Sequence, residues 1–281
     1  MTRDGVPIQW RGMAKTDKVN LSETYADSVV ALSPFALKKL GILSNQTILK
    51  IDTYNLVCVP YRLSMKGAVL LGSFSRDEIV FFQRFKGSLA GLNLVIQPGD
   101  AQTPRKIFCR CSLAQFAPMK GRDSVGLISV EFRPCPPDLE SLMGNYMMLM
   151  DRLRADYKDL AGKTVPVNPE SAKILGFNNY ATLNAGPIVT KLALYTLGAD
   201  RLVFLAPMQT PDLPLGEGAT LRLFFQKYQF NVTGKITEAV RLPTGVQKGA
   251  VVLEFSPELV DLLEMYYLQA KLGARNPKPA G

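Results

Sequence analysis

The sequence contains no histidine, four cysteines and a single tryptophan in 281 residues. Without histidine the chain lacks the commonest general base, the commonest metal ligand and the usual pH-sensitive side chain. Cys109 and Cys111 form the one close cysteine pair, and no second pair completes a four-sulfur metal site. We therefore expect no metal and no disulfide, with these two cysteines buried as small apolar side chains on one face of a strand.

Several motifs are absent as well. The sequence has no glycine-rich phosphate loop, no Gly-x-Ser-x-Gly nucleophile elbow and no carboxylates clustered at helical spacing in an apolar setting. It also has no signal-peptide pattern and no apolar run of the ~20 residues that span a bilayer. These absences predict a cytoplasmic protein that is not an enzyme.

The charge is unbalanced, with 33 Lys and Arg against 24 Asp and Glu, a formal net charge of +9. Such an excess favours anionic partners, which include nucleotides, nucleic acid and acidic protein surfaces.

One pattern occurs twice along the chain. The stretch Val69–Phe81 resembles Leu192–Phe204, and an offset of 123 residues relates Ser73 to Thr196 and Phe132 to Phe255. Between these positions the sequence Leu92–Ile96 matches Leu221–Phe225 at an offset of 129, and the extra residues lie in a proline-rich segment. Gaps confined to turns are typical of a duplicated domain.

Each copy begins with a short helix that Ser33-Pro34 or Asn168-Pro169 starts and Gly41 or Gly176 ends. Short, evenly spaced apolar runs follow, which predict the strands of a small closed barrel. In the first copy these runs are 47–51, 56–59, 68–71, 79–82, 92–96, 107–113 and 126–132. The expected fold is mainly β with helices: a flexible arm over residues 1–30 and two tandem barrels over 31–160 and 161–281, each ending in a longer helix.

The longer helix of the first copy is expected over residues 137–160. Its apolar residues recur in steps of three and four, and at ~1.5 Å per residue it is longer than one small barrel can cover. We therefore predict that this stripe is buried against the second domain or against the same helix of another chain. Its members are Leu139, Leu142, Tyr146, Leu149 and Leu153.

The strand-turn-strand stretch, the closing strands that end in Glu131-Phe132 and Glu254-Phe255, and the terminal helices together resemble the PilZ domain family. The resemblance covers residues 33–160 and 168–272 and is greatest to tandem proteins of the flagellar-brake type. It implies small β-barrels that act as receptors for cyclic di-GMP, with no other cofactor.

This sequence differs strongly from the binding motif of that family. The family carries two arginines four residues apart and then an Asp-x-Ser-x-x-Gly turn, whereas no two arginines in this chain are four apart. Planar arginine forks grip phosphates through paired charge-assisted hydrogen bonds, so their loss weakens nucleotide binding. What remains is a weak candidate ligand set: Arg62, Lys66, Ser73, Ser75 and Arg76.

Three functions follow from this pattern. The first is a non-enzymatic PilZ-like regulatory or adaptor protein in cyclic di-GMP-linked control of motility or the cell surface, with degenerate nucleotide sites and a protein partner or homodimer on helix 137–160. The second is a true cyclic di-GMP receptor with a non-standard site. The third is a barrel that binds single-stranded nucleic acid through Arg105, Lys106 and Arg110, with Phe108 among them. Two features oppose it: the sequence predicts Arg105 and Lys106 in a turn, and a single aromatic ring is a poor platform for stacking bases.

Overall fold

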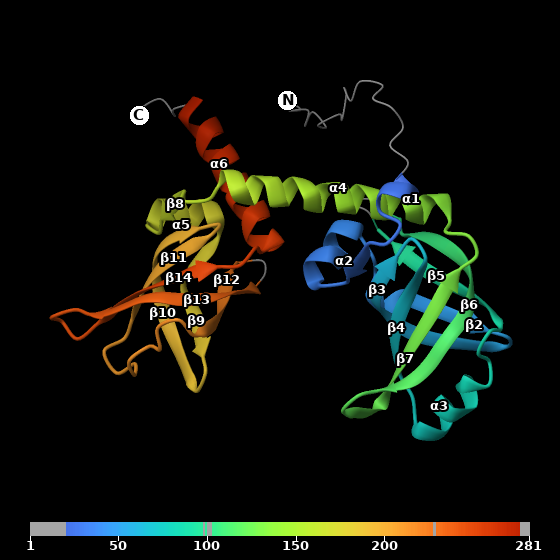
Figure 1. Cartoon of the computed structure of the whole chain (residues 1–281). Coiled ribbons are helices and arrows are strands. Elements are labelled where there is room, and N and C mark those ends of the chain that lie inside the picture. The colour runs from blue at the N-terminus through green and yellow to red at the C-terminus, as the bar shows by residue number, and fades with distance from the viewer. Residues whose placement is uncertain (1–20, 98, 100–102, 227–228, 276–281) are drawn as a thin grey trace, which may run out of the picture. The chain divides into compact units, whose positions relative to one another are not determined.

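The computed structural model describes residues 21–97, 99, 103–226 and 229–275, and the chain forms two compact units (Figure 1). Unit 1 comprises residues 1–148 and unit 2 residues 149–281. The predicted boundary at residue 160 lies too late, because the end of the long helix packs within unit 2, where Tyr157 Oη donates a hydrogen bond to Leu253 O at 3.1 Å.

Unit 1 is a closed barrel of antiparallel strands. Six strands follow one another around it in the order β2-β3-β4-β7-β6-β5, and the β2–β5 pairing closes the circuit. A further short strand, β1 (Val29–Ala31), pairs with β3 outside the circuit. The barrel strands are β2 (Thr47–Ile51), β3 (Tyr54–Ser64), β4 (Gly67–Ser73), β5 (Leu89–Ile96), β6 (Arg105–Met119) and β7 (Arg122–Phe132).

Unit 2 repeats this topology strand by strand. Its circuit runs β9-β10-β11-β14-β13-β12, and β8 (Thr164–Pro166) pairs with β10 as β1 pairs with β3. The shared strand order confirms the predicted pair of barrels. The strands are β9 (Phe177–Ala185), β10 (Ile188–Gly198), β11 (Arg201–Ala206), β12 (Gly218–Phe225), β13 (Gln229–Arg241) and β14 (Gln247–Leu253).

The stretch that suggested the duplication is itself misaligned. Ile79–Phe82 was predicted as a strand, but it lies in helix α3 (Arg76–Gln83). Ser73 ends β4, whereas Thr196 lies in β10, the counterpart of β3, so the two stretches do not occupy equivalent elements. The match of Leu92–Ile96 to Leu221–Phe225 is correct, because these residues form the equivalent strands β5 and β12.

The remaining helices agree well with their sequence signals. Helices α2 (Pro34–Leu40) and α5 (Pro169–Leu175) begin after the capping side chains of Ser33 and Asn168 and end at left-handed glycines, Gly41 and Gly176. The long helix α4 spans Pro137–Asp159, and α6 spans Pro257–Arg275. None of the helices in the described ranges is long and apolar enough to cross a membrane.

The predicted N-terminal arm needs a correction. Residues 1–20, including Trp10, lie outside the described residues. Residues 21–30, however, form helix α1 (Leu21–Thr24), a turn and the start of β1. Leu21 packs so closely on Gly144 of α4 that a Cβ on that glycine would lie 2.5 Å from the leucine side chain. Residues 21–30 are therefore part of unit 1.

Each barrel has its own apolar interior. Along β2, Leu49 and Ile51 are fully buried while Ile48 and Lys50 face outward, which is the alternation expected of a strand with one buried face. In unit 2 the ring of Phe204 is fully buried against Gly249, where a Cβ would lie 2.3 Å from the ring. Each unit is therefore stabilised by its own hydrophobic core.

Candidate functional site

The five candidate ligand residues are divided between the two ends of strand β4. Arg62 lies in β3 and Lys66 in the turn before β4, whereas Ser73 ends β4 and Ser75 and Arg76 begin helix α3. At ~3.3 Å per residue, the seven steps from Lys66 to Ser73 span roughly 23 Å. Lys66 and Ser73 therefore lie at opposite ends of β4, whereas Arg62 pairs with Val69, the third residue of this strand.

Arg62 and Lys66 line a shallow hollow of about 250 Å³ at one end of β4, together with Ser64, Ser129 and Glu131. The Lys66 Nζ lies 2.5 Å from Asp27 Oδ1. The hydrogen bond and then the positive charge of Lys66 lower the pKa of Asp27. Lys66 is paired with Asp27, the Arg62 guanidinium lies 5.3 Å from the centre of the Tyr61 ring, and Glu131 adds a carboxylate to the lining, so this hollow is a poor environment for a phosphate pair.

Ser75 and Glu78 are occupied within the helix that they start. The Ser75 hydroxyl accepts a hydrogen bond from the Glu78 N–H at 3.2 Å, and the Ser75 N–H donates to Glu78 Oε2 at 2.7 Å. This is a capping box, and the backbone hydrogen bond from Ser75 lowers the pKa of Glu78. Ser75, which is the serine at the middle position of the family's Asp-x-Ser-x-x-Gly turn, therefore caps α3.

Replacing Ser75 with alanine is expected to lower the free energy of unfolding of unit 1 by about 1 kcal/mol, because the N–H of Glu78 loses its cap. Ser73→Ala is the matched control, since Ser73 is an exposed serine at the end of β4, outside the capping box. Urea denaturation of both variants gives the comparison. Equal losses for the two variants would contradict the capping role.

Helix α3 covers an aromatic end of barrel 1. A hollow of about 690 Å³ there is lined by Tyr54, Ser73, Phe74, Phe81 and Phe82 among others, and it has no Lys or Arg in its lining. The Tyr54 ring lies 5.5 Å from the rings of both Phe81 and Phe82, edge to face. This hollow is suited to apolar groups and offers no cation to a phosphate.

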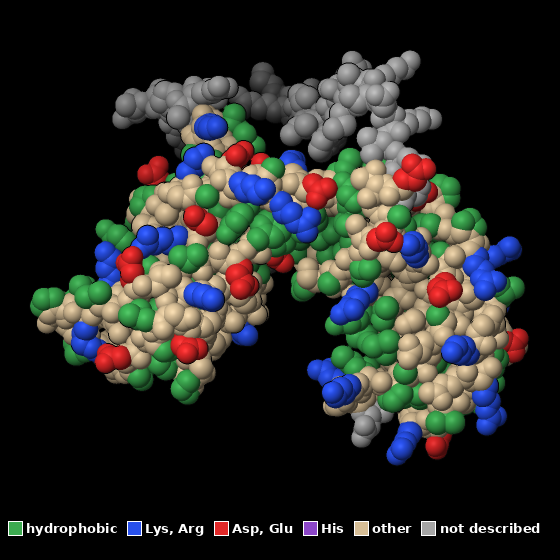
Figure 2. All heavy atoms as spheres, in the orientation of Figure 1, with side chains coloured by type: hydrophobic (Ala, Val, Ile, Leu, Met, Phe, Trp, Pro, Cys, Tyr) green, Lys and Arg blue, Asp and Glu red, His purple; other side chains and the backbone are tan. Residues whose placement is uncertain are grey.

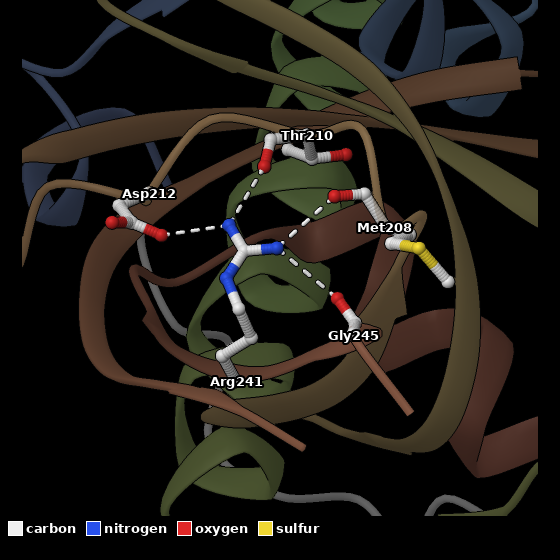
Figure 3. Close-up of polar contacts among 5 residues, drawn as sticks. All are labelled: Met208, Thr210, Asp212, Arg241 and Gly245. Atoms are coloured by element: carbon white, nitrogen blue, oxygen red, sulfur yellow. Dashed lines mark hydrogen bonds and ion pairs between the residues drawn. The ribbon is translucent and has the colours of Figure 1, made fainter. Parts of the chain in front are cut away.

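In unit 2 the proline-rich loop 207–217 stands where unit 1 has α3, and Arg241 of β13 holds it (Figure 3). The Arg241 Nη1 donates to the carbonyl oxygens of Met208 and Gly245 at 3.0 and 3.1 Å. The Nη2 donates to Thr210 O at 3.2 Å and to Asp212 Oδ1 at 2.8 Å. Both terminal nitrogens of this guanidinium therefore bind protein oxygens. No local pattern in the sequence predicts this contact.

Unit 2 has a hollow of about 350 Å³ between the end of α4 and α6. Its lining includes Asp156, Glu264 and Lys271, and Arg152 lies 3.3 Å from Glu264 Oε2 and 3.6 Å from Asp156 Oδ2. Burial, followed by a hydrogen bond with Asp156, raises the pKa of Glu264. The lining holds three carboxyl groups, Asp156, Asp159 and Glu264, against Lys163 and Lys271, which disfavours an anionic ligand.

The predicted stripe of α4 is largely buried. Leu139, Tyr146 and Leu153 are buried, and Leu142 and Leu149 are half-buried. Along the helix, Leu139 to Tyr146 belong to unit 1 and Leu149 and Leu153 to unit 2. That the stripe is an interface with the second domain or with another chain stays a prediction.

The cysteines have no feature of a reactive site. All four are free, and Cys58, Cys109 and Cys111 are buried. Burial raises the pKa of Cys58 and Cys109 to about 12, so these thiols stay protonated at neutral pH. Within the described part of the chain no group of His, Cys, Asp or Glu is arranged to hold a metal ion.

The basic residues of the third hypothesis are on a strand. Arg105 and Lys106, predicted as turn residues, begin strand β6, and Lys106, Phe108 and Arg110 are exposed at alternating positions on its outer face. Figure 2 shows basic side chains beside exposed hydrophobic side chains on the visible face of unit 1.

Comparison with known proteins identifies the first unit. Residues 19–148 match the model of the PilZN3 domain family, and the match ends at the same residue as unit 1. Residues 19–148 are therefore similar to a PilZN3 domain, in agreement with the predicted resemblance, and this match spans just under half of the chain. No curated protein matches the sequence.

Several solved structures resemble the chain. They include the Borreliella burgdorferi PlzA protein in complex with c-di-GMP, with a TM-score of 0.42 and 15% identity over 88% of this chain and 96% of that one. YcgR from Escherichia coli in complex with c-di-GMP has a TM-score of 0.30 and 14% identity, over 90% of this chain and 96% of that one. The Bacillus subtilis inhibitor of motility MotI/DgrA has a TM-score of 0.27 and 10% identity, over 81% and 95%. At such TM-scores these likenesses assign no site on this chain.

Proposed function

We propose that this chain is a non-enzymatic PilZ-like regulatory protein in cyclic di-GMP-linked signalling, which controls motility or the cell surface through contacts with other proteins. The PilZN3 match in residues 19–148 supports the link to this signalling system, because PilZ-like domains are its receptors. The observation that carries the rest is the division of the candidate ligand residues. Arg62 and Lys66 lie at one end of β4, and Ser73, Ser75 and Arg76 lie at the other.

A degenerate nucleotide site is consistent with how the remaining side chains are used. Lys66 pairs with Asp27, Ser75 caps α3, and Arg241 binds four protein oxygens. Each of these groups would have to leave a protein partner before it could bind a phosphate. In this proposal, contacts with other proteins carry the signal to this chain or from it.

The second candidate function, a receptor with a non-standard site, is favoured by one observation. Arg62 and Lys66 line the same hollow with Ser64 and Ser129, so a cation pair and two hydroxyl-bearing residues converge there. The Glu131 carboxylate in the lining of this hollow and the Asp27 carboxylate that pairs with Lys66 both oppose an anion, and for this reason we place the receptor second.

Loss of the gene in the source organism is expected to alter swimming or surface attachment when cyclic di-GMP is raised. A chain with both Arg62→Ala and Lys66→Ala is expected to restore the normal phenotype, because neither residue contributes to a working nucleotide site. Swimming diameter and attached cell mass measure the outcome. An unaltered deletion strain would contradict the regulatory role, and failure of the double variant to complement would favour the receptor.

A further inference from the structure

The outer face of barrel 1 carries a row of four residues in register across four strands, and three of the four side chains are apolar. Ile48 of β2 lies opposite Val57 of β3 on one side and opposite Asn93 of β5 on the other. Asn93 in turn lies opposite Phe108 of β6. Val57 and Phe108 are 67% and 59% exposed, and Val59, two residues along β3 on the same face, is exposed as well.

Cations border this row. Lys50 and Arg110 both lie opposite Gly91, so they flank a position without a side chain. A Cβ on Gly91 would lie 2.7 Å from the Phe108 ring, which shows that the ring lies across the glycine, between the two cations. Lys106 is exposed two residues before Phe108 on the same strand. We call these seven residues the outer patch: Ile48, Val57, Val59, Phe108, Lys50, Lys106 and Arg110.

The four strands beneath the outer patch, β2, β3, β5 and β6, are fully described and contain no Asp or Glu. Lys50, Lys106 and Arg110 form no ion pair within the described ranges. The patch therefore carries uncompensated positive charge around exposed apolar side chains.

Barrel 2 shows that the fold does not require this composition. Its equivalent row, in the same register across β10, β9, β12 and β13, consists of Lys191, Thr182, Arg222 and Asn231. In this row all four side chains of unit 2 are polar, whereas three of the four in unit 1 are apolar, although β9 and β10 of unit 2 expose Tyr180 and Val189 elsewhere. Exposed apolar groups that the fold does not need are typical of an interaction surface.

We infer that the outer patch is the docking surface for an acidic protein partner that presents apolar side chains, an inference that rests on the proposed adaptor function. The partner's Asp and Glu residues complement Lys50, Lys106 and Arg110, and its apolar groups cover Ile48, Val57 and Phe108. A second copy of this chain is disfavoured, because the same patch on both copies would bring like charges together. Nucleic acid is disfavoured because three of the four apolar side chains are aliphatic, whereas bases stack on aromatic rings.

Site-specific photo-crosslinking tests the inference on the full-length chain. The probe is purified protein with p-benzoylphenylalanine at position 48, and the matched control carries it at position 182, the equivalent position of barrel 2. Each is illuminated in extract from the source cells, and the crosslinked peptides are sequenced. We expect a protein adduct at position 48, in a segment with more Asp and Glu than Lys and Arg, and little at position 182.

Charge reversal makes the test specific. Lys50→Glu with Arg110→Glu is expected to lower the yield of the position-48 adduct by about tenfold or more, because two attractions become repulsions. Both side chains are exposed and form no ion pair with the residues that the structure describes, so an unchanged melting temperature verifies the fold. The inference is overturned by no adduct at position 48, by an adduct to nucleic acid or a second copy, by a partner segment that is not acidic, or by a yield that charge reversal leaves unchanged.

The experiments distinguish an error in the docking inference from an error in the proposed function. If position 48 gives no adduct while cyclic di-GMP also fails to bind, the adaptor function stands and the docking surface lies elsewhere. If cyclic di-GMP binds tightly while the charge-sensitive adduct persists, the patch stands and the claim of degenerate nucleotide sites is wrong.

Discussion

Replacing Phe204 with alanine is expected to lower the free energy of unfolding of unit 2 by about 3–5 kcal/mol, the usual cost of removing a fully buried aromatic ring. Phe204 is 0% exposed on β11 and packs against Gly249 of β14. The neighbouring strands cannot close on the space, because hydrogen bonds pair β11 with both β10 and β14 around the circuit. Most of the cavity therefore remains.

Native-state hydrogen exchange with mass spectrometry measures this effect unit by unit. We expect the amides of unit 2 to lose protection and those of unit 1 to keep it, because the two barrels have separate cores. Tyr195→Ala on β10 is the control, since that ring is 59% exposed and its removal should cost about 0.5 kcal/mol or less. A loss of protection shared equally by unit 1 would contradict the two-core description.

Much of the fold could be predicted from local sequence signals. Ser33-Pro34 and Gly41 mark the ends of α2, and Asn168-Pro169 and Gly176 mark those of α5, because a capping side chain and a left-handed glycine satisfy the free backbone groups at helix ends. The strands follow from alternation, as in β2, where Leu49 and Ile51 are buried and Ile48 and Lys50 are not. Such signals depend only on neighbouring residues.

Helix α3 was missed although its signal is present. The run Ile79 to Phe82 is rich in β-branched and aromatic residues, which favour strands. The preceding Ser75 and Glu78, however, form a capping box that starts a helix, and Ile79 and Phe82 are buried at helical spacing. The match of Ser73 to Thr196 therefore aligned β4 and α3 of unit 1 with β10 and β11 of unit 2, which are not equivalent elements.

The candidate site depended on contacts that no local pattern specifies. Lys66 meets Asp27 across 39 positions, and Arg241 meets Asp212 across 29. Such pairings arise only when the barrels close and bring distant segments together. The spacing and the predicted strand 68–71 placed Arg62 near Lys66 and a strand between Lys66 and Ser73, but they could not show that Lys66 pairs with Asp27.

Binding of cyclic di-GMP is expected to be weak or absent. A dinucleotide needs paired guanidinium forks on its phosphates, and no two arginines of this chain have the family spacing. Two lost charge-assisted contacts at ~1.5–3 kcal/mol each correspond to roughly two to four decades in affinity. The fork of Arg241 cannot replace them, because it already binds four protein oxygens.

Isothermal titration of the purified full-length chain with cyclic di-GMP, at about 0.15 M salt, tests the claim of degenerate nucleotide sites directly. The wild-type chain and the Arg62→Ala, Lys66→Ala double variant are titrated side by side. We predict no saturable heat from either protein at a Kd tighter than about 10 µM. A sub-micromolar Kd for the wild-type chain, abolished in the double variant, would show instead that the Arg62 and Lys66 hollow is a working receptor site.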